Sequence, residues 1–493
     1  MNKHYDLIVI GCGPGGYKSA ILAAQAGYNV AIIEKSQAGG TCLNQGCVPK
    51  ESLTRVAKLI DDLIAFDGLG LDAKVKPNFS DAITQKNKLV RSIGQTIQPW
   101  LKQLGIHYIQ GDASFVNKNT INVKINSSDN ADTNNEINII GDRIIIATGS
   151  KPKQHPTIPY ASPNIINSKD FMFDIKAAPK RVLFIGGGSI GTELGFVLHQ
   201  FGSSVTISEI SDRLLNLPGI SERASATLER KFKQLGITVK KNTRAIAEVT
   251  SEKSVNIVFS DKTAEGFDLV IIAIGRTANT DGLQLENAGV KTDQDGFIST
   301  NEFLETTSNG IYAIGDVKQG PMTANAAFHD AKIATANALS GNKNKCNYDQ
   351  IPIVIDSALQ IASVGYTEEG AEDAGFEPEL VRTNLAGSTI GQLTHNVQGF
   401  IEIVHDEETG NVIGGCVIGP EAREMIHTIS AASRNGRGLC FFTDLNYAHP
   451  SWNEEFENTV SRYVSEYTPP EKNIPHQTIM RDNTQTGKIK NPE

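Results

Sequence analysis

Two glycine-rich segments constrain the fold of this chain more than any other feature. In the first, three glycines in the order G-x-G-x-x-G follow a short apolar run, and an acid ends the next apolar run: Gly11, Gly13, Gly16 and Glu34. The first glycine permits a tight turn, the second lets a pyrophosphate approach the backbone, and the third lets the helix pack closely on the strand. The acid is placed to accept hydrogen bonds from a ribose. This segment therefore predicts a βαβ unit that binds a nucleotide.

The same layout returns in the middle of the chain and predicts a second nucleotide-binding unit. Its three glycines and its acid are Gly186, Gly188, Gly191 and Glu209. A carboxylate at the position of Glu209 repels the 2′-phosphate of NADP, which favours NAD, although the nearby Arg213 leaves NADP open. Two dinucleotide sites in one chain indicate a relay between a held cofactor and an exchanging one. A flavin and a nicotinamide are the natural pair for such a relay.

Cys42 and Cys47 lie just after the first fingerprint, in the sequence GGTCLNQGCVPK. Their spacing fits no zinc motif. A disulfide needs Cα atoms within about 7 Å, which residues five apart in a regular helix do not reach, so a bridge requires a distorted turn that Gly46 allows. Taken alone, the pair is interpreted as two free thiols; beside a flavin fingerprint, we predict a redox-active pair. The remaining cysteines show no partner pattern: Cys12, Cys346, Cys416 and Cys440.

The segments between and after the fingerprints predict further elements. Residues 50–66 and 81–103 are predicted helices, and the polar residues 124–138 predict a loose hairpin or loop. Residues 351–465 alternate strand-like and helix-like pieces without a glycine fingerprint, which predicts a separate α+β domain. Three short apolar runs that end in or next to glycine predict further buried strands: 143–149, 269–275 and 311–316.

Composition excludes several classes of protein. The formal net charge of −9 and the lack of a basic block argue against binding to nucleic acid. No apolar run approaches the ~18 residues that a membrane-spanning helix needs. Six cysteines in 493 residues are too few for a secreted disulfide scaffold. We therefore predict a cytoplasmic protein that binds neither nucleic acid nor membrane.

Seven motifs in their order resemble those of the FAD-binding pyridine nucleotide-disulfide oxidoreductases: GCGPGGY, GGTCLNQGCVPK, ATGSKP, GGGSIGTELG, AIGRTANT, YAIGD and HPSWNE. The resemblance implies an α/β fold with two Rossmann-like nucleotide-binding domains and a C-terminal α+β dimerisation domain. It also implies tightly bound FAD, exchangeable NAD and a homodimer. The implied division is an FAD-binding domain (1–150), an NAD-binding domain (151–279), a central segment that completes the FAD domain (280–350), an interface domain (351–466) and a flexible tail (467–493).

The resemblance also implies roles for individual residues. Cys47 would lie against the flavin, Cys42 would exchange with the substrate, and Glu454 would orient the catalytic base His449 and raise its basicity. Lys50 and Glu193 would pair near the flavin ring. The residues implied to hold FAD are Gly11, Gly13, Gly16, Glu34, Ala113, Thr148, Gly149, Ser150 and Asp316. Those implied to hold NAD are Gly186, Gly188, Gly191, Glu209 and Gly275. No residue is predicted to bind a metal.

Within the family, the chain looks most like the dihydrolipoamide dehydrogenase branch. No cysteine follows Cys440, which disfavours the mercuric reductases and the large thioredoxin reductases. The presence of the cysteine pair disfavours the soluble transhydrogenases. Glu209 disfavours the glutathione and trypanothione reductases, which use NADP. The implied reaction is oxidation of protein-bound dihydrolipoamide through the disulfide and FAD to NAD. The implied partner is the lipoyl domain of a 2-oxoacid dehydrogenase or related complex. The alternatives are a glutathione-type or other disulfide reductase using NAD(P)H, and a flavin-binding structural subunit without turnover.

Several departures from the lipoamide branch leave the substrate open. Lys50 directly follows Pro49, as in the glutathione-type enzymes, whereas the lipoamide type places its lysine one residue later. Residues 322–327 lack the histidine typical of the lipoamide branch, and alanines replace two familiar prolines at Ala278 and Ala358.

Overall fold

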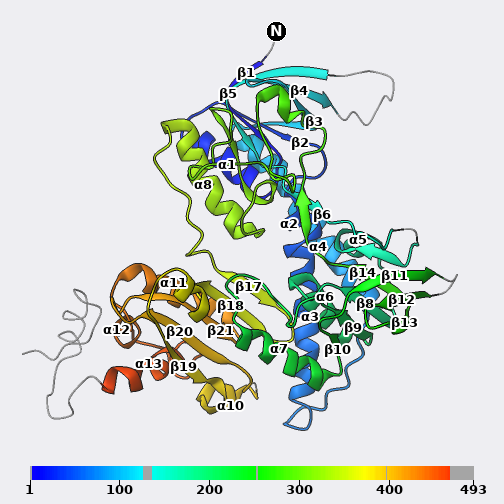
Figure 1. Cartoon of the computed structure of the whole chain (residues 1–493), viewed down its shortest axis with the longest axis vertical. Helices are drawn as coiled ribbons and strands as arrows, with labels where there is room; N and C mark the ends of the chain where they lie inside the picture. Colours follow the sequence, from blue (N-terminus) through cyan, green and yellow to red (C-terminus); the bar gives the residue numbers. More distant parts are fainter. Residues whose placement is uncertain (1–2, 126–135, 161, 251–253, 396, 467–493) are drawn as a thin grey trace, which may run out of the picture.

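Short runs of Ile, Val and Leu form the central strands of the first domain, as expected for parallel strands that are buried on both faces. The computed structural model describes residues 3–125, 136–160, 162–250, 254–395 and 397–466. The first sheet lies at the top of Figure 1, and the second domain and the interface domain lie side by side below it. The predicted tail at 467–493 lies outside the described residues.

In the first sheet, β1 runs parallel to β2 on one side and to β5 on the other, and β16 adds to β5. β3 continues the sheet from β2, and an antiparallel meander through β4 returns to β5. Its strands are β1 (Lys3–Ile10), β2 (Val30–Glu34), β3 (His107–Asn117), β4 (Thr120–Ile125), β5 (Glu136–Ile146) and β16 (Ile311–Ala313). The predicted hairpin over 124–138 joins β4 to β5, and its residues 126–135 lie outside the described part.

Helices cover this sheet and extend below it. α1 and α8 pack together, and their alanine and isoleucine side chains share one core with a face of the sheet. α3 and α4 run down from the first domain along the second one (Figure 1). The helices are α1 (Pro14–Gln25), α2 (Gly40–Gln45), α3 (Cys47–Ala65), α4 (Phe79–Gln103) and α8 (Ala324–Ser340), with a 3-10 turn η2 (Gly315–Val317). The helices predicted at 50–66 and 81–103 correspond to α3 and α4.

The second domain repeats the arrangement on a smaller scale. Its five parallel strands follow the order β10-β9-β8-β14-β7, with a three-stranded antiparallel sheet beside them. The parallel strands are β7 (Ile165–Asn167), β8 (Arg181–Ile185), β9 (Ser204–Ser208), β10 (Thr238–Lys240) and β14 (Leu269–Ile272). The antiparallel strands are β11 (Ala245–Thr250), β12 (Val255–Phe259) and β13 (Ala264–Phe267). The helices are α5 (Ser168–Asp174), α6 (Ser189–Gln200) and α7 (Glu222–Leu235). The 3-10 turn η1 (Leu285–Ala288) follows this domain in the chain and packs against β3 of the first sheet.

A two-stranded ribbon joins the first two domains. In it, β6 (Ser150–Pro152) pairs antiparallel with β15 (Arg276–Ala278). The chain thus leaves and re-enters the first domain at two adjacent points, close to the boundaries at 150 and 279 that the sequence predicts. Those boundaries, and the one at 350, stay predictions.

The interface domain is an antiparallel sheet of the order β17-β18-β21-β20-β19, backed by α11. Its strands are β17 (Ile353–Asp356), β18 (Gln360–Gly365), β19 (Pro378–Asn384), β20 (Phe400–Asp406) and β21 (Val412–Ile418). Its helices are α9 (Glu368–Asp373), η3 (Leu385–Gly387), α10 (Thr389–Leu393), α11 (Ala422–Asn435), α12 (Cys440–Thr443) and α13 (Glu455–Glu466). The predicted fold class is therefore confirmed: two Rossmann-like domains and a C-terminal α+β domain.

The largest hydrophobic cluster crosses the domain borders. It joins Leu53 and Ala57 of α3 to the core of the second domain and to Ile355 and Ile361 of the interface domain. Ala358, one of the two positions where an alanine replaces a familiar proline, packs against this cluster. Across the described residues, no helix combines the length and the apolar character that crossing a membrane requires.

Candidate active site

A cavity of about 590 Å³ opens at the carboxyl ends of β1, β2, β5 and β16, where ligands of open α/β sheets bind. The first fingerprint, the two cysteines and the loops after β5 and β16 line it. Of the predicted residues, the lining includes Gly11, Gly13, Glu34, Cys42, Cys47, Thr148, Gly149, Ser150 and Asp316. Gly16, Lys50 and Ala113 lie outside the lining, and Ala113 sits within β3.

The glycines of the first fingerprint occupy positions that a side chain would not fit. Gly11 has a φ of +103°, and a Cβ there would lie 2.4 Å from the carbonyl oxygen of Ala147. A Cβ on Gly16 would lie 1.9 Å from the carbonyl oxygen of Gly11, so the third glycine allows the helix to touch the strand. The nearest atom to a Cβ on Gly13 is 3.9 Å away, which leaves its backbone open to the cavity.

The second fingerprint has the same geometry. A Cβ on Gly186 would lie 2.3 Å from the carbonyl oxygen of Ala273, and one on Gly191 would lie 2.1 Å from that of Gly186. A Cβ on Gly188 would meet nothing within 4 Å. Gly275, predicted to lie at this site, follows β14 with a φ of +103° and likewise faces open space. Each fingerprint therefore exposes one backbone position at the start of a helix, where N–H groups and the helix dipole favour an anion.

The two acids are held in matching ways. Glu34 accepts hydrogen bonds from the backbone N–H groups of Cys12 (2.7 Å) and Ser36 (2.8 Å). Glu209 accepts them from the N–H groups of Gly187 (2.6 Å) and Ser211 (2.8 Å). Each carboxylate is thus fixed against its glycine turn before a nucleotide arrives. Arg213, the residue that leaves NADP open, donates instead to the carbonyl oxygen of Ile220 at 3.0 Å.

The cysteine pair lies at a break between two helices. α2 ends at Gln45, Gly46 takes φ −128° and ψ −108°, and α3 begins at Cys47. The sequence predicts this distortion, because a regular helix would hold the two sulfurs apart. In the structure the two sulfurs are not bonded to each other, and a side-chain hydrogen bond joins Cys42 to Cys47.

The hydrogen bond shifts the pKa values of the two thiols in opposite directions. The hydrogen bond to Cys47, together with burial, raises the pKa of Cys42. The hydrogen bond from Cys42 lowers the pKa of Cys47 against the opposing effect of burial, and the nearby charge of Lys50 lowers it further. Because the thiolate is the reactive form of cysteine, Cys47 is the sulfur of the pair that holds a negative charge most readily.

The positively charged Lys50 also forms a salt bridge with Glu193. Its Nζ lies 3.0 Å from Oε1 of Glu193, on the fingerprint helix α6 of the second domain. The glutathione-type position of Lys50, directly after Pro49, therefore does not prevent this predicted pair from forming.

The loops after β5 and β16 meet at the floor of the cavity. Ser150 Oγ donates to Asp316 Oδ2 at 2.7 Å, which joins two predicted residues from distant parts of the sequence. Thr148 Oγ1 is buried and has no hydrogen-bond partner among the described residues. An orphaned buried hydroxyl beside a polar cavity indicates that a ligand supplies the missing partner. Together with the open backbone at Gly13 and the fixed acid Glu34, this lining fits a dinucleotide.

His449 and Glu454 form a pair outside the residues that line the cavity. His449 Nδ1 lies 2.8 Å from Glu454 Oε2, and the imidazole is 72% exposed. Burial acts to raise the pKa of Glu454, but the hydrogen bonds from His449 and from the backbone N–H of Ser451 lower it overall. A carboxylate on one ring nitrogen leaves the other free to exchange a proton.

Sequence reasoning missed Arg276 and Asn279, which line the cavity from β15 and the loop after it. Arg276 Nε donates to Ser150 Oγ at 2.6 Å, and its Nη2 donates to the carbonyl oxygen of Ser150 at 2.7 Å. Both residues belong to the motif AIGRTANT, which identifies the segment but does not single out either residue as part of the site. Met322 and Thr323, from the segment that lacks the histidine typical of the lipoamide branch, also line the cavity.

Comparison with known families agrees with this geometry. The profile of the pyridine nucleotide-disulphide oxidoreductases matches residues 5–331, and that of their dimerisation domain matches residues 351–460. The dihydrolipoyl dehydrogenase of Bacillus subtilis (strain 168) is 34% identical over 456 residues, which cover 91% of this chain and 94% of the relative. The mitochondrial dihydrolipoyl dehydrogenase of Pisum sativum is 32% identical over 457 residues, which cover 91% and 89%.

Two solved structures resemble the chain over almost its whole length. The HOCl-induced flavoprotein disulfide reductase RclA from Escherichia coli, in its Cu(II) complex, superimposes with a TM-score of 0.83 at 26% identity and covers 94% of this chain and 100% of RclA. LpdA from Mycobacterium tuberculosis gives a TM-score of 0.85 at 22% identity, over 94% and 99%, which supports the fold. The chain therefore belongs to the pyridine nucleotide-disulphide oxidoreductase family and is an FAD-dependent disulfide oxidoreductase that uses NAD(H).

Proposed function

We propose that the protein oxidises dihydrolipoamide carried on a lipoyl domain and transfers the electrons to NAD. The observation that carries this proposal is the hydrogen-bonded Cys42–Cys47 pair at the edge of the cofactor cavity, with Lys50 beside it. The relatives named dihydrolipoyl dehydrogenase, at 31–34% identity, support lipoamide as the substrate. A flavin-binding subunit without turnover is not favoured, because the thiol pair and the His449–Glu454 pair are both intact.

In the proposed reaction, the oxidised enzyme holds a Cys42–Cys47 disulfide. A thiolate of dihydrolipoamide attacks the sulfur of Cys42, the disulfide breaks, and Cys47 leaves as a thiolate. The second substrate thiol gives its proton to His449 and attacks the mixed disulfide, which releases lipoamide and leaves Cys42 reduced. Bound FAD, which the residues of the first fingerprint would hold, would supply the redox chemistry that links the dithiol to NAD. Lys50 stabilises the negative charge on Cys47 throughout.

We further propose that each active site is shared by two chains of a homodimer. His449 is exposed and lies outside the residues that line the cavity of its own chain, and it belongs to the domain that matches the family's dimerisation domain. A base that is exposed and does not line the cavity of its own chain is available to a second copy of the chain. The lipoyl domain of a 2-oxoacid dehydrogenase or related complex as partner, and the cytoplasmic location, stay predictions.

The proposed cofactor contacts follow the two fingerprints. FAD would lie along Gly11, Gly13 and Gly16, with its ribose at Glu34 and the remaining contacts from Ala113, Thr148, Gly149, Ser150 and Asp316. NAD would lie along Gly186, Gly188 and Gly191, with its ribose at Glu209 and a further contact at Gly275.

We expect Glu209→Ala to lower the preference for NAD over NADP by about 10–150-fold, because one charged hydrogen bond is worth about 1.5–3 kcal/mol. The measurement is the ratio of kcat/KM for the two nucleotides. Glu209 also holds the N–H groups of Gly187 and Ser211, but loosening that loop affects both nucleotides and cancels in the ratio. An unchanged ratio would place the selectivity elsewhere, with Arg213 as the next residue to change.

The substrate is tested by measuring two rates side by side. The holoenzyme is given dihydrolipoamide with NAD, and glutathione disulfide with NADPH. Faster turnover of dihydrolipoamide by several orders of magnitude supports the proposal, whereas faster reduction of glutathione disulfide contradicts it. The position of Lys50 after Pro49 and the missing histidine in 322–327 are the reasons for including glutathione disulfide.

A further inference from the structure

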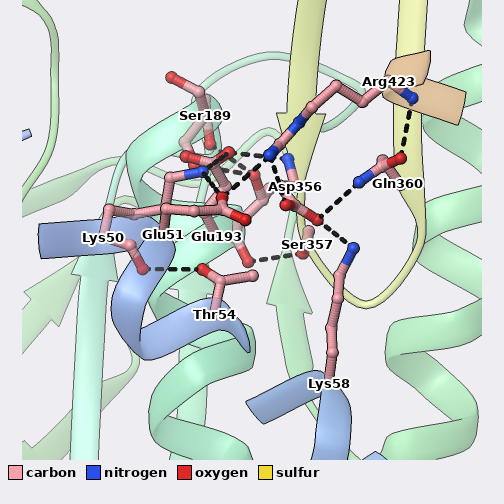
Figure 2. A network of polar contacts seen from close by, with 12 residues as sticks. Lys50, Glu51, Thr54, Lys58, Ser189, Glu193, Asp356, Ser357, Gln360 and Arg423 are labelled. Carbon is pink, nitrogen blue, oxygen red and sulfur yellow. Dashed lines mark hydrogen bonds and ion pairs between the residues drawn. The ribbon is translucent and has the colours of Figure 1, made fainter. Parts of the chain in front are cut away.

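A network of charged side chains connects α3, the helix that begins at Cys47, to the second domain and to the interface domain (Figure 2). Its cations are Lys50, Lys58 and Arg423, and its anions are Glu51, Glu193 and Asp356. Three positive and three negative groups leave the network neutral. It includes the Lys50–Glu193 pair already described, but its centre is Asp356, at the end of β17 in the interface domain.

Asp356 is almost completely buried, with 2% of its side chain exposed, and its ion pairs with Lys58 and Arg423 reach other elements. Its Oδ1 pairs with Lys58 of α3, and its Oδ2 lies 2.5 Å from Nη2 of Arg423 in α11. Arg423 reaches α3 as well, because the same Nη2 lies 2.9 Å from Oε2 of Glu51. Gln360 donates to Asp356 at 3.4 Å and accepts from the backbone N–H of Arg423 at 2.8 Å. The interface domain thus holds α3 at two points along its first three turns.

The turn that begins at Asp356 also holds α6. The backbone N–H of Asp356 donates to Glu193 Oε1 at 2.7 Å, the same oxygen that pairs with Lys50. The next residue, Ser357, donates through Oγ to the carbonyl oxygen of Thr192 at 2.8 Å. The orientation of Glu193 toward Lys50 is therefore fixed from the interface domain.

Two features distinguish this junction from ordinary packing. Lys50, Thr54 and Lys58 follow one another at intervals of four residues, so they lie on one face of α3. A sliding or rotation of α3 would break several directional contacts at once, whereas a purely apolar contact tolerates small shifts. The cations keep Asp356 ionised, because together they lower its pKa against the effect of burial.

We propose that Asp356 is a positioning residue that fixes the start of α3, and with it Cys47 and Lys50, relative to α6 and the interface domain. The inference rests on the proposed roles of Cys47 and Lys50 in the reaction. Asp356 touches neither the cysteines nor the cavity lining, so it acts through the helix. Its removal should displace the sulfur of Cys47 rather than block substrate binding.

The test compares Asp356→Asn with a matched control, Glu402→Gln. Glu402 is also a buried carboxylate of the interface domain that pairs with two cations, Arg223 of α7 at 2.9 Å and Arg382 at 3.4 Å. Its ion pairs reach the second domain but not α3. Each variant keeps the size of its side chain and removes one buried charge, so general destabilisation affects both.

Two readouts report on α3 itself. The first is amide hydrogen exchange of residues 47–58, and the second is the long-wavelength absorbance between the Cys47 thiolate and the flavin in the two-electron-reduced holoenzyme. We expect Asp356→Asn to speed exchange in α3 by about 10-fold and to lower the absorbance by about half at equal FAD content, because local protection and orbital overlap both fall when a helix start is released. Glu402→Gln should leave both readouts at the wild-type value.

Lys58→Gln keeps the proposal testable if Asp356→Asn does not fold, because Lys58 is partly exposed and, within the described part of the chain, its ion pair is the one with Asp356. It should show the same two changes at smaller size. The proposal is overturned if α3 exchange and absorbance stay at the wild-type value in Asp356→Asn or Lys58→Gln, or if Glu402→Gln changes them equally. If the wild-type enzyme itself lacks the long-wavelength absorbance, the proposed role of Cys47 fails, and hydrogen exchange still decides the role of Asp356.

Discussion

Replacing Cys42 by serine is expected to lower turnover with dihydrolipoamide by at least about 10³-fold, because removing the attacking or attacked group of a covalent mechanism costs most of its rate. FAD should stay bound, since the fingerprint and the cavity floor are unchanged. The substitution removes the hydrogen bond from the Cys42 thiol, but Lys50 stays beside Cys47 and favours its charged form, so the Cys47 thiolate should give a long-wavelength absorbance without any reductant. Absorbance spectra and a lipoamide assay on the same sample provide the measurement.

The sign of the pH dependence follows from the pKa of Cys47. Because the charge of Lys50 acts to lower the pKa of Cys47 in the variant as well, the absorbance should persist at neutral pH and disappear on acidification, when the sulfur takes up a proton. Cys346→Ser is the matched control, since Cys346 is a partly buried thiol outside the cavity lining, and it should keep both turnover and the wild-type spectrum. Full lipoamide activity in Cys42→Ser would end the proposed relay.

His449→Gln is expected to slow turnover by about 10²–10⁴-fold, the usual contribution of a general base. The variant should keep FAD, and NADH should still reduce the flavin, because neither step uses the imidazole. Glu454→Gln should lose less, since this carboxylate orients the ring 2.8 Å away without taking the substrate proton. Stopped-flow measurement of the two half-reactions separates the proton transfer from flavin reduction by NADH.

A mixed dimer tests whether the site is shared. If His449 serves the other chain, a heterodimer of Cys42→Ser and His449→Gln chains contains one site with both defects and one with neither, so it should recover about half of the wild-type activity. If each chain uses its own His449, both sites carry one defect, and verified heterodimers stay inactive.

The sequence predicts the parts of this site that depend on short-range patterns. The glycine fingerprints, Glu34 and Glu209 are recognisable because turn geometry and phosphate approach allow few residue types at fixed spacings. The break at Gly46 follows from the geometry that a bridge between Cys42 and Cys47 requires. In each case the physical requirement acts over a few residues, and the structure places them accordingly.

Other parts of the site depend on contacts between distant segments. Nothing near Asp356 in the sequence indicates that its carboxylate meets Lys58 and Arg423, because α3, β17 and α11 are brought together only by the packing of three domains. The same holds for Arg276, which reaches Ser150 across the β6–β15 ribbon. The position of Ala113 outside the cavity lining is also a result of strand pairing, which a motif does not specify.

The hydrophobic cluster that joins Leu53, the second domain and Ile355 has a consequence for how the protein melts. Apolar contact across a border makes the stability of each side depend on the other, so a fragment that ends near residue 350 would leave the partners of Ile355 and Ile361 in water. The domain boundaries predicted from the sequence describe function and chain topology, whereas the unit that unfolds cooperatively is larger than any one of these domains. Heating should therefore unfold these regions in one calorimetric transition, with the binding of either nucleotide stabilising all of them together.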